Sequence, residues 1–387
     1  MNPSIVLTMI VRNEARVLPR SLASFRALGK TGCDLAYAIV DGGSTDHSIE
    51  IIEREMVGTK GRVQMVPQPQ PLDDFSAARN ASIELARPLA GWMFMLDADD
   101  EIVVDPGFKM PDLDAIGVGG FAIKVRFGSD EFYRPALVKS SLPWHYEGEL
   151  HEHIECTGGS PIPRLEGIHI LVHPGEGSRS ADPRQKFLND ALVLRKALEK
   201  KPGDPRNLFY LAQSLRDAGE LNDSLAVYEE RGNMMAAWDE ETYFALLQIA
   251  RIKAALELPL DEVQEAYLRA FNFRPTRAES LGFLAEYLRL KGKFTSAAYF
   301  AHAAMQIPKP GDVLFVGCDW YEWRAEDEFS VACFYLGDPG ASKRACLSLL
   351  TNPKLPAAHW ERVNKNLAFA NEALSRLTHP KQEPVSV

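Results

Sequence analysis

Residues 91–101 read "GWMFMLDADDE", an apolar run that ends in a cluster of acidic side chains. The apolar part has the composition of a buried strand in a parallel sheet. Burying unpaired charge is costly, so packing gives no reason to place four acidic residues in the five positions 97–101. A divalent cation, or charge that is needed at the strand end, does give a reason. We therefore expect a ligand site where this strand ends.

Further apolar runs precede it and alternate with helical patterns. The runs "IVLTMIV" (5–11), "YAIV" (37–40) and "VQMV" (63–66) predict three strands before "WMFML" (92–96). Helices are predicted between them, from near Pro19 to Gly29, after "GGSTD" and after "PLDD". This βαβα order predicts a doubly wound, mostly parallel sheet that binds ligands at the carboxyl ends of its strands. Residues 120–175 are irregular and strand-rich, and we expect them to complete the same domain.

The second half of the chain, residues 184–307, consists of helical patterns that repeat. "LFYLAQSLRDAGELNDSLAVYEE" (208–230) aligns with "LGFLAEYLRLKGKFTSAAYFAHA" (281–303), so that Leu208 matches Leu281, 73 residues later. Half of this offset is close to the period of tetratricopeptide repeats, about 34 residues. A middle copy runs from residue 242 to a proline at 275. An all-helical bundle without repeats is the alternative.

The repeats suggest how the chain is organised after the first domain. Gly219 and Gly292 are expected at the turns where one helix of a pair passes into the next. Less regular helical patterns follow and are expected to cap the stack. We predict a domain over residues 1–178, a helical domain over 179–310 and a C-terminal helical cap over 311–387.

Composition limits the classes of partner. The 387 residues carry a formal net charge of −10, which argues against binding nucleic acid or an anionic membrane by bulk attraction. No stretch resembles a transmembrane span, and the first residues lack the pattern of a signal peptide. The five cysteines are scattered without metal-ligand spacing. We expect free thiols and a cytoplasmic protein.

Four short stretches follow the predicted strands in order. They are "TMIVRNEA" (8–15), "VDGGSTD" (40–46), "DDFSAARNASI" (73–83) and "LDADDE" (96–101). Because the ends of consecutive strands of such a sheet meet along one edge, these stretches are expected to converge on one site.

This set resembles the nucleotide-sugar-dependent glycosyltransferases of family 2, which have the GT-A fold. In that family a "KNE"-like turn follows the first strand, "D-x-G-S-T-D" ends the second, and a DxD motif ends the fourth. Here these are "RNE", "DGGSTD" and Asp97-Ala98-Asp99. The likeness is good over about residues 4–105 and weaker to about 175. It implies a Rossmann-like GT-A domain, followed by an all-α tetratricopeptide-repeat-like domain. That architecture resembles bacterial and phage glycosyltransferases, including peptide S-glycosyltransferases.

The resemblance implies a metal-dependent, inverting transfer in which a hexose leaves a nucleotide sugar, with a UDP-sugar favoured. Mn²⁺ or Mg²⁺ would neutralise the diphosphate, with Asp99, Asp97 and His173 as the implied metal ligands. Asp41 would accept a hydrogen bond from the base, and Arg79 would contact phosphate at a helix start. The implied nucleotide-sugar-binding residues are Thr8, Arg12, Asn13, Glu14, Asp41, Gly43, Asp46, Arg79, Asp97, Ala98 and Trp144.

Each assignment has a structural alternative. Asp41 and Asp46 can cap helices, and Arg79 can be an ordinary surface arginine. His173 can be a hydrogen-bonded histidine with no metal. These alternatives weaken if all the groups converge on one site.

The stretch "SSLPWHYEGELHEHIEC" (140–156) is dense in titratable groups. Zinc is disfavoured, because "HEH" lacks the helical HExxH spacing and no cysteine pair completes a site. By resemblance we expect Glu152 to be the general base, with His151 orienting it or contacting the sugar, and Asp100 as the rival base. Trp144 would offer a platform for a sugar ring. The alternative is a charged strand edge with a buried tryptophan.

Two other functions are compatible with the same sequence. One is a peptide- or protein-binding scaffold whose transferase domain is inactive. Another is a nucleotidyltransferase, although that class favours a glycine-rich phosphate loop and "RNEARVLPR" (12–20) has no glycine. The acceptor of a transferase can be a saccharide, a peptide or another small molecule. The helical domain can also serve a homodimer.

Overall fold

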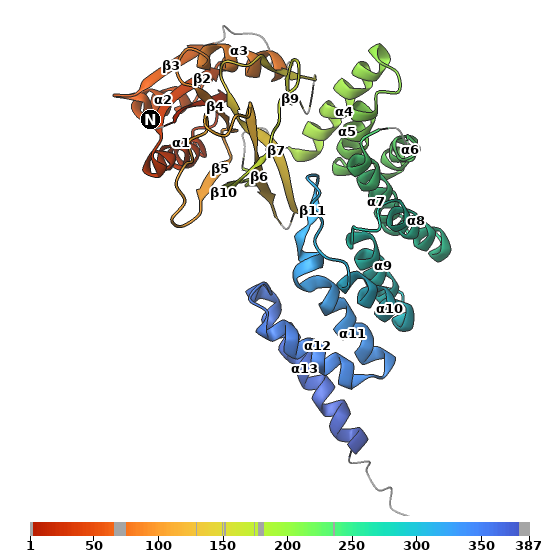
Figure 1. Cartoon of the computed structure of the whole chain (residues 1–387). Helices are drawn as coiled ribbons and strands as arrows, with labels where there is room; N and C mark the ends of the chain where they lie inside the picture. The colour runs from red at the N-terminus through yellow and green to blue at the C-terminus, as the bar shows by residue number, and fades with distance from the viewer. Residues whose placement is uncertain are drawn as a thin grey trace, which may run out of the picture. The chain divides into compact units, whose positions relative to one another are not determined.

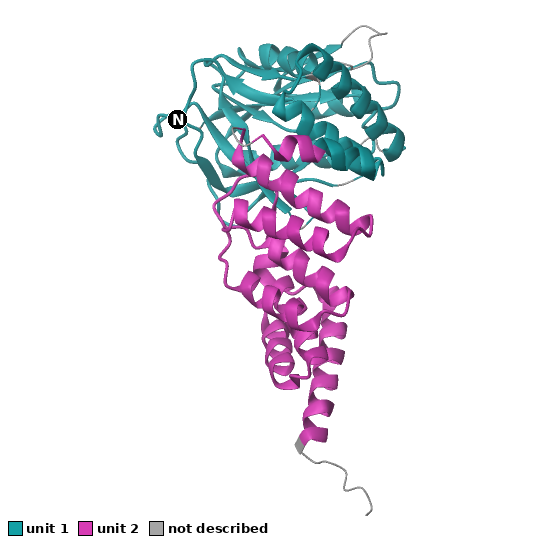
Figure 2. Cartoon of the chain, turned by 90° about the vertical axis from the view of Figure 1, so that its right-hand side faces the viewer, with its two compact units in different colours: residues 1–227 teal, residues 228–387 magenta. Residues whose placement is uncertain are grey.

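The computed structural model describes residues 3–65, 75–128, 130–148, 150, 152–173, 175–176, 182–234 and 237–378. The chain divides into two compact units, Met1–Val227 and Tyr228–Val387 (Figure 2). Strands give way to helices earlier than this boundary, between β10 (Arg164–Leu171) and α4 (Pro183–Lys200). In the described part of the chain, no helix is both long and apolar enough to span a bilayer.

The first unit is built on a mixed sheet whose first four strands are parallel (Figure 1). These strands are β1 (Ser4–Val11), β2 (Asp34–Asp41), β3 (Lys60–Met65) and β4 (Trp92–Met95). They lie in the order β3-β2-β1-β4, so the four predicted strands are confirmed. The strand order reverses beside β1, and open α/β sheets bind ligands at the carboxyl ends of the strands on either side of such a reversal.

The sheet continues from β4 in the order β7-β6-β10-β5. The strands are β5 (Glu101–Val104), β6 (Gly120–Phe127) and β7 (Asp130–Lys139) in addition to β10. β7 is antiparallel to β4 and β6, whereas β10 runs parallel to β6. A separate hairpin is formed by β8 (Trp144–Glu147) and β9 (His153–Cys156).

Helices cover both faces of this sheet. Alternate residues of β1 point to opposite faces. Ile5 and Leu7 share one core with Phe25 of α1 (Leu18–Ala27) and with α2 (Ser48–Met56). Val6 lies in a second core with Ile83 of α3 (Phe75–Ala86) and with the β8–β9 hairpin. The three predicted helices are therefore present, and the sheet lies between two helical layers.

The remaining elements are almost all helices (Figure 1). After α4 come α5 (Pro205–Asp217), α6 (Leu221–Gly232), α7 (Asp239–Ala255), α8 (Leu260–Phe273), α9 (Glu279–Leu290) and α10 (Phe294–Met305). Then follow a short strand, β11 (Val316–Gly317), a π-helical turn, η3 (Trp320–Arg324), and the helices α11 (Ala325–Leu336), α12 (Pro339–Thr351) and α13 (Ala357–Thr378).

The backbone confirms the repeat. Gly219 and Gly292 have φ angles of +84° and +71° at the turns after α5 and α9. In both turns the next residue donates its amide to a carbonyl five residues earlier, at 2.9 and 2.8 Å. The turn after α7 makes the same bond at 3.1 Å, but its left-handed residue is Glu257, with a φ of +55°. Between α5 and α10, the same type of C-terminal helix cap therefore occurs three times.

Candidate functional site

The loops after β1 and β2 are hydrogen-bonded to each other. The amide of Asn13 donates to Ser44 Oγ at 2.9 Å, and Asn13 Oδ1 accepts from the Thr45 amide at 2.7 Å. The amide of Ala15 donates to Asp46 Oδ2 at 3.0 Å. Asn13 has a φ of +56°, a left-handed conformation that asparagine tolerates better than most residues. The "RNE" and "DGGSTD" motifs therefore shape each other's loops.

Asp41, the last residue of β2, is fully buried. Its Oδ2 accepts from the amides of Gly43 and Ser44 at 2.9 and 3.0 Å, and its Oδ1 accepts from the Ser44 hydroxyl at 2.5 Å. Gly43 has a φ of +84°, which suits glycine. The Asp41 carboxylate therefore closes the turn that precedes α2, a local structural role close to the capping alternative.

A second group of side chains meets at the end of β4. Arg79 of α3 donates to Asp97 Oδ1 at 2.6 Å and through Nε to Glu152 Oε1. Arg134 of β7 donates to Asp97 Oδ2 at 3.2 Å and to Asp100 Oδ2 at 3.0 Å. Side chains from four separate segments thus form one ionic cluster, which we call the strand-end cluster. The structure excludes the surface-arginine alternative for Arg79, whose side chain is 16% exposed.

The pKa values in this cluster are pushed apart. Burial opposes ionisation of Asp97, but Arg79 and Arg134 outweigh it and lower the pKa of Asp97. Burial, followed by the charge of Asp97, raises the pKa of Asp100 to about 7. The same two causes raise the pKa of Asp99. Negative charge is therefore in excess here, and the cluster favours an additional cation.

Asp99 is the carboxylate that fits this need. Among the described residues, no other side chain donates a hydrogen bond to its carboxylate, which is half-buried. Both oxygens of Asp97 accept from arginines, and His173 Nε2 lies 2.9 Å from Glu101 Oε2. Mg²⁺ and Mn²⁺ need only one or two carboxylates when a substrate supplies phosphate oxygens. The residues present therefore fit a cation held by Asp99, whereas Asp97 and His173 are engaged elsewhere.

Arg20 of α1 fixes the backbone at the same strand end. It donates to the carbonyl of Asp99 at 2.9 Å and to Glu176 Oε2 at 2.6 Å, and its Nε lies 3.8 Å from Glu101 Oε2. Because Glu101 also contacts His173, this guanidinium joins the segment after β10 to the segment after β4.

Helix α3 also holds the β8–β9 hairpin. Asn80 donates to the carbonyl of Tyr146 at 3.0 Å and accepts from its amide at 2.7 Å. The guanidinium of Arg79 lies 5.3 Å from the centre of the Tyr146 ring. Arg87 donates to three carbonyls at 2.7–2.9 Å, those of Ser140, Leu142 and Trp144. Helix α3 and Arg87, the residue after its end, therefore position the hairpin in which Glu152 directly precedes β9.

Three predicted donor-binding residues lie in the core instead of at the site. Trp144 is 1% exposed and packs beneath α3, so it offers no platform for a sugar ring, and the buried-tryptophan alternative holds. Thr8 lies inside β1, 3% exposed, and donates to the carbonyl of Phe94 at 3.4 Å. Ala98 is 6% exposed in the core on the other face. Trp144 and Ala98 pack in apolar cores and Thr8 lies within a strand, so none of the three side chains is exposed for contact with a donor.

Other predicted residues lie near the motif loops or beyond the described part. Arg12 and Glu14 are half-buried in the loop after β1, where the Glu14 amide donates to Ser48 Oγ at 2.9 Å. His151 lies outside the described residues.

Sequence reasoning missed Arg134 and Arg20. A signal for Arg134 was present, because an arginine interrupts the otherwise apolar strand sequence "YRPALV" (133–138). A buried charge in a strand needs a partner, and the acidic cluster after β4 was the available one. Arg20 had no comparable signal.

Comparisons with known proteins agree with this picture. Residues 6–107 match the family model described as Glycosyl transferase family 2. A TPR repeat-containing protein of Synechococcus elongatus is 36% identical over 99 residues, which are 26% of this chain and 21% of that protein. The chain thus matches about a fifth of the length of this curated relative.

Similar solved structures include proteins of two kinds. S. aureus TarS in complex with UDP-GlcNAc is 16% identical, with 68% of this chain and 83% of that chain covered and a TM-score of 0.34. A tetratricopeptide repeat protein from Parabacteroides merdae is 14% identical, with 50% and 70% covered and a TM-score of 0.38.

The family match spans β1 to β5 and contains all four motif stretches in full, together with most of the strand-end cluster. The helices after β10 repeat their capping turns with a tetratricopeptide-like period. Residues 6–107 are therefore similar to glycosyl transferase family 2, and a tetratricopeptide-repeat-like helical region follows them in the chain.

Proposed function

We propose that this protein is a metal-dependent, inverting glycosyltransferase that uses a nucleotide sugar, with a UDP-sugar as the favoured donor. The acceptor is a saccharide, a peptide or another small molecule. The observation that carries the proposal is Arg79, which binds Asp97 of the DxD motif and Glu152 at once. Arg79 thereby joins the DxD motif, which we assign to the diphosphate end of the donor, to Glu152, which we assign to the acceptor end.

The donor end of the site is assigned to the strand ends. The diphosphate of the donor is the leaving group, and it gains negative charge as the bond to the sugar breaks. Mn²⁺ or Mg²⁺, held by Asp99, would supply the neutralising charge. Arg79 and Arg134 lie next to Asp97 and provide fixed positive charge on the same side. Electrostatic stabilisation of this kind is often the largest contribution to catalysis.

The acceptor end is assigned to Glu152. In an inverting transfer the acceptor atom attacks the anomeric carbon opposite the diphosphate, whose bonding electrons leave with the nucleotide. The acceptor proton must pass to a base on the attacking side. Glu152 is 11% exposed and oriented by Arg79. Asp100 is the rival base, because its pKa of about 7 suits proton transfer near neutral pH.

The first test is donor turnover by the full chain. Hydrolysis of a panel of UDP-, GDP- and dTDP-sugars with Mn²⁺ is expected to show one preferred donor, and UDP with Mn²⁺ is expected to raise the melting temperature. A scaffold with an inactive domain would show neither effect. In Asp99→Asn, metal-dependent stabilisation by UDP and turnover should be lost together. UDP stabilisation that still required Mn²⁺ in this variant would refute the assignment of Asp99.

The second test separates the two candidate bases. Glu152→Gln is expected to keep donor affinity and to lose transfer by about 10²–10⁴-fold, the usual contribution of a general base. Asp100→Asn should leave transfer measurable. The reverse pattern would move the base role to Asp100.

A further inference from the structure

The β8–β9 hairpin has one apolar face and one polar face. Side chains alternate between faces along each strand. The inward face packs against the core below α3, through Trp144, Tyr146, Ile154 and Cys156. The outward face carries the side chains in between, which are His145, Glu147, His153 and Glu155. All four are metal-ligand types, and their side chains are 34–56% exposed.

The register of the hairpin gathers these four side chains. His145 lies directly opposite Glu155, and Glu147 lies directly opposite His153. The Cβ atoms of residues that face each other across an antiparallel pair are about 4.5–5.5 Å apart. The outward face is therefore a two-by-two array in which each histidine has a glutamate beside it on its own strand and another across the hairpin.

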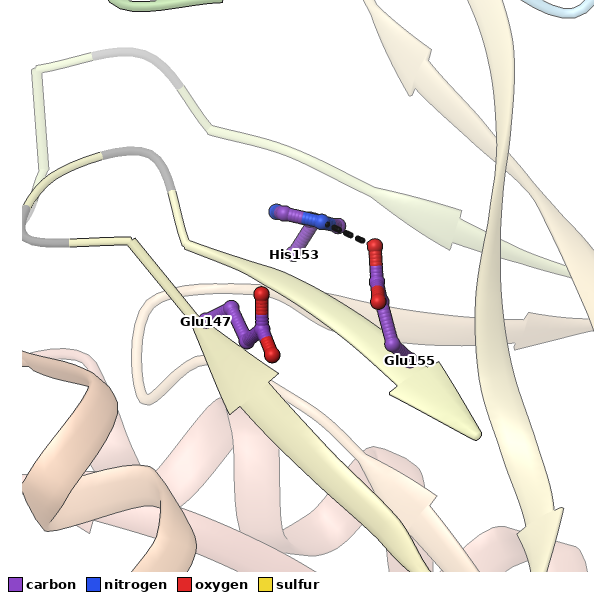
Figure 3. Close-up of side chains that lie close together, drawn as sticks. All are labelled: Glu147, His153 and Glu155. Atoms are coloured by element: carbon purple, nitrogen blue, oxygen red, sulfur yellow. Dashed lines mark hydrogen bonds and ion pairs between the residues drawn. The ribbon is translucent and has the colours of Figure 1, made fainter. Parts of the chain in front are cut away.

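The ligand atoms are already close. His145 Nε2 lies 2.9 Å from Glu147 Oε1, and His153 Nε2 lies 2.6 Å from Glu155 Oε1. Ligand atoms of Glu147, His153 and Glu155 all lie within 4.8 Å of one another, which holds for no other such trio in the described part of the chain (Figure 3). Two ligands on a tetrahedral Zn²⁺ with bonds of 2.0–2.1 Å are about 3.3 Å apart. Small side-chain movements are therefore enough for these three side chains to bind one ion, and His145, which contacts Glu147, is the nearest fourth ligand.

We propose that His145, Glu147, His153 and Glu155 bind one Zn²⁺ ion on the outward face of this hairpin. Two imidazole nitrogens with two carboxylate oxygens make a donor set that favours Zn²⁺ over Mg²⁺ or Ca²⁺. Nδ1 of His153 is buried and has no partner among the described residues, so Nε2 is the nitrogen that meets the other groups. The spacing within one strand argued against zinc, but the second strand supplies the missing ligands.

An ion in this position cross-links the two strands. β8 and β9 form a separate two-stranded sheet of four residues each, whose inward face is held by α3 and the core below it. Because isolated hairpins of this size are marginally stable, a cross-link on the outward face would add to these contacts. The chain between the strands leads to Glu152, so the ion would also fix both flanks of that segment. The binding itself does not depend on the proposed transferase activity.

The test is metal binding by the full chain after removal of bound metal with a chelator. Isothermal titration with Zn²⁺ alone is expected to show a site of one equivalent, and Co²⁺ in its place should give the visible absorption of a tetrahedral complex. His145→Gln and His153→Gln should each weaken this site by about 10- to 100-fold or more. Because both side chains lie on the polar, partly exposed face of the hairpin, melting temperatures without metal should stay close to that of the unaltered protein.

Two matched variants decide where the ion binds. His47→Gln removes another histidine–glutamate contact, of 3.1 Å with Glu50 on α2, and is expected to leave Zn²⁺ binding unchanged. Asp99→Asn should also keep the hairpin site. The proposal is overturned if the unaltered protein binds no Zn²⁺, if His145→Gln and His153→Gln bind it as tightly as before, or if Asp99→Asn abolishes the binding.

Discussion

Each compact unit contains a cluster of arginines and carboxylates. The two clusters differ in whether every carboxylate accepts hydrogen bonds from other side chains. In the helical unit, Arg277 is 1% exposed and donates to both oxygens of Glu279 at 3.0 Å and to Asp312 at 3.1 Å. Arg274 binds the same Asp312 at 2.6 and 2.7 Å, and the Tyr321 hydroxyl donates to Glu279 at 2.6 Å. Both carboxylates of this helical cluster therefore have several donors.

The strand-end cluster is not satisfied in this way. Arg79 donates hydrogen bonds to Asp97 and Glu152, and Arg134 donates to Asp97 and Asp100. By contrast, no other described side chain donates to the carboxylate of Asp99. Burial opposes ionisation in both clusters, but hydrogen bonds from two arginines lower the pKa of Asp312, whereas the pKa of Asp100 is raised. The helical cluster is closed and structural. The strand-end cluster retains uncompensated negative charge, which is what a site that accepts a cation requires.

The largest expected effect is on the stability contributed by the helical cluster. Arg277→Met leaves Glu279 and Asp312 buried without their main partner, which should lower the free energy of unfolding by about 3–5 kcal/mol. Urea denaturation followed by far-UV circular dichroism measures this change. Arg376→Met is the control, because Arg376 is 77% exposed in its pair with Glu372, and its effect should stay within about 0.5 kcal/mol. Equal stability of the two variants would show that the helical cluster is not the structural element described here.

The next largest effect is the pH dependence of stability that arises from the strand-end cluster. The folded-state pKa of Asp100 is about 7, above its ordinary 3.8, so between these values the folded protein holds a proton that the unfolded chain releases. The free energy of unfolding should therefore fall as pH rises through this window, by about 2–4 kcal/mol in total. Asp100→Asn should remove most of this fall. Denaturation at pH 5 and pH 8 without divalent cations measures it.

The matched control is Asp312 of the helical cluster, whose pKa is shifted in the opposite direction. The pKa of Asp312 is lowered, so its stabilising contribution is fully present above its ordinary pKa and is lost only as pH falls below that value. Asp312→Asn should therefore destabilise the protein by the same amount at pH 5 and pH 8. If Asp100→Asn kept the pH dependence of the unaltered protein, the raised pKa would be excluded as its cause.

The sequence alone could predict the strands, the helical repeat and the place where the motifs converge. The strands came from short apolar runs and the repeat from matched positions such as Gly219 and Gly292, because periodic burial leaves a periodic trace. The convergence of Arg79 with the residues that follow β4 was predictable from the order of the strand ends. The resemblance between motifs also led to the family that matches residues 6–107.

What the sequence could not show was how each polar group divides its hydrogen bonds. Asp41 uses both oxygens on its own turn, although the motif alone favoured a contact with the donor's base. Trp144 alternates with exposed histidines, yet the register of the hairpin places it in the core. Arg134 reaches the site from β7, a strand that pairs antiparallel with β4 and lies far along the chain. Such partners depend on tertiary register, which leaves no local pattern.

The smallest expected effect lies in the repeated caps, and it tests whether the helical unit is as regular as its pattern. Glu257 is exposed and adopts a φ of +55° where the other two caps have glycine. Glu257→Gly removes this strain and should raise the free energy of unfolding by about 1 kcal/mol. Gly292→Ala should lower it by a similar amount, because nothing lies within 4 Å of the added Cβ and the backbone conformation alone opposes the change. If the two substitutions shifted stability in the same direction, the three turns would not be equivalent caps, since a shared left-handed position requires effects of opposite sign.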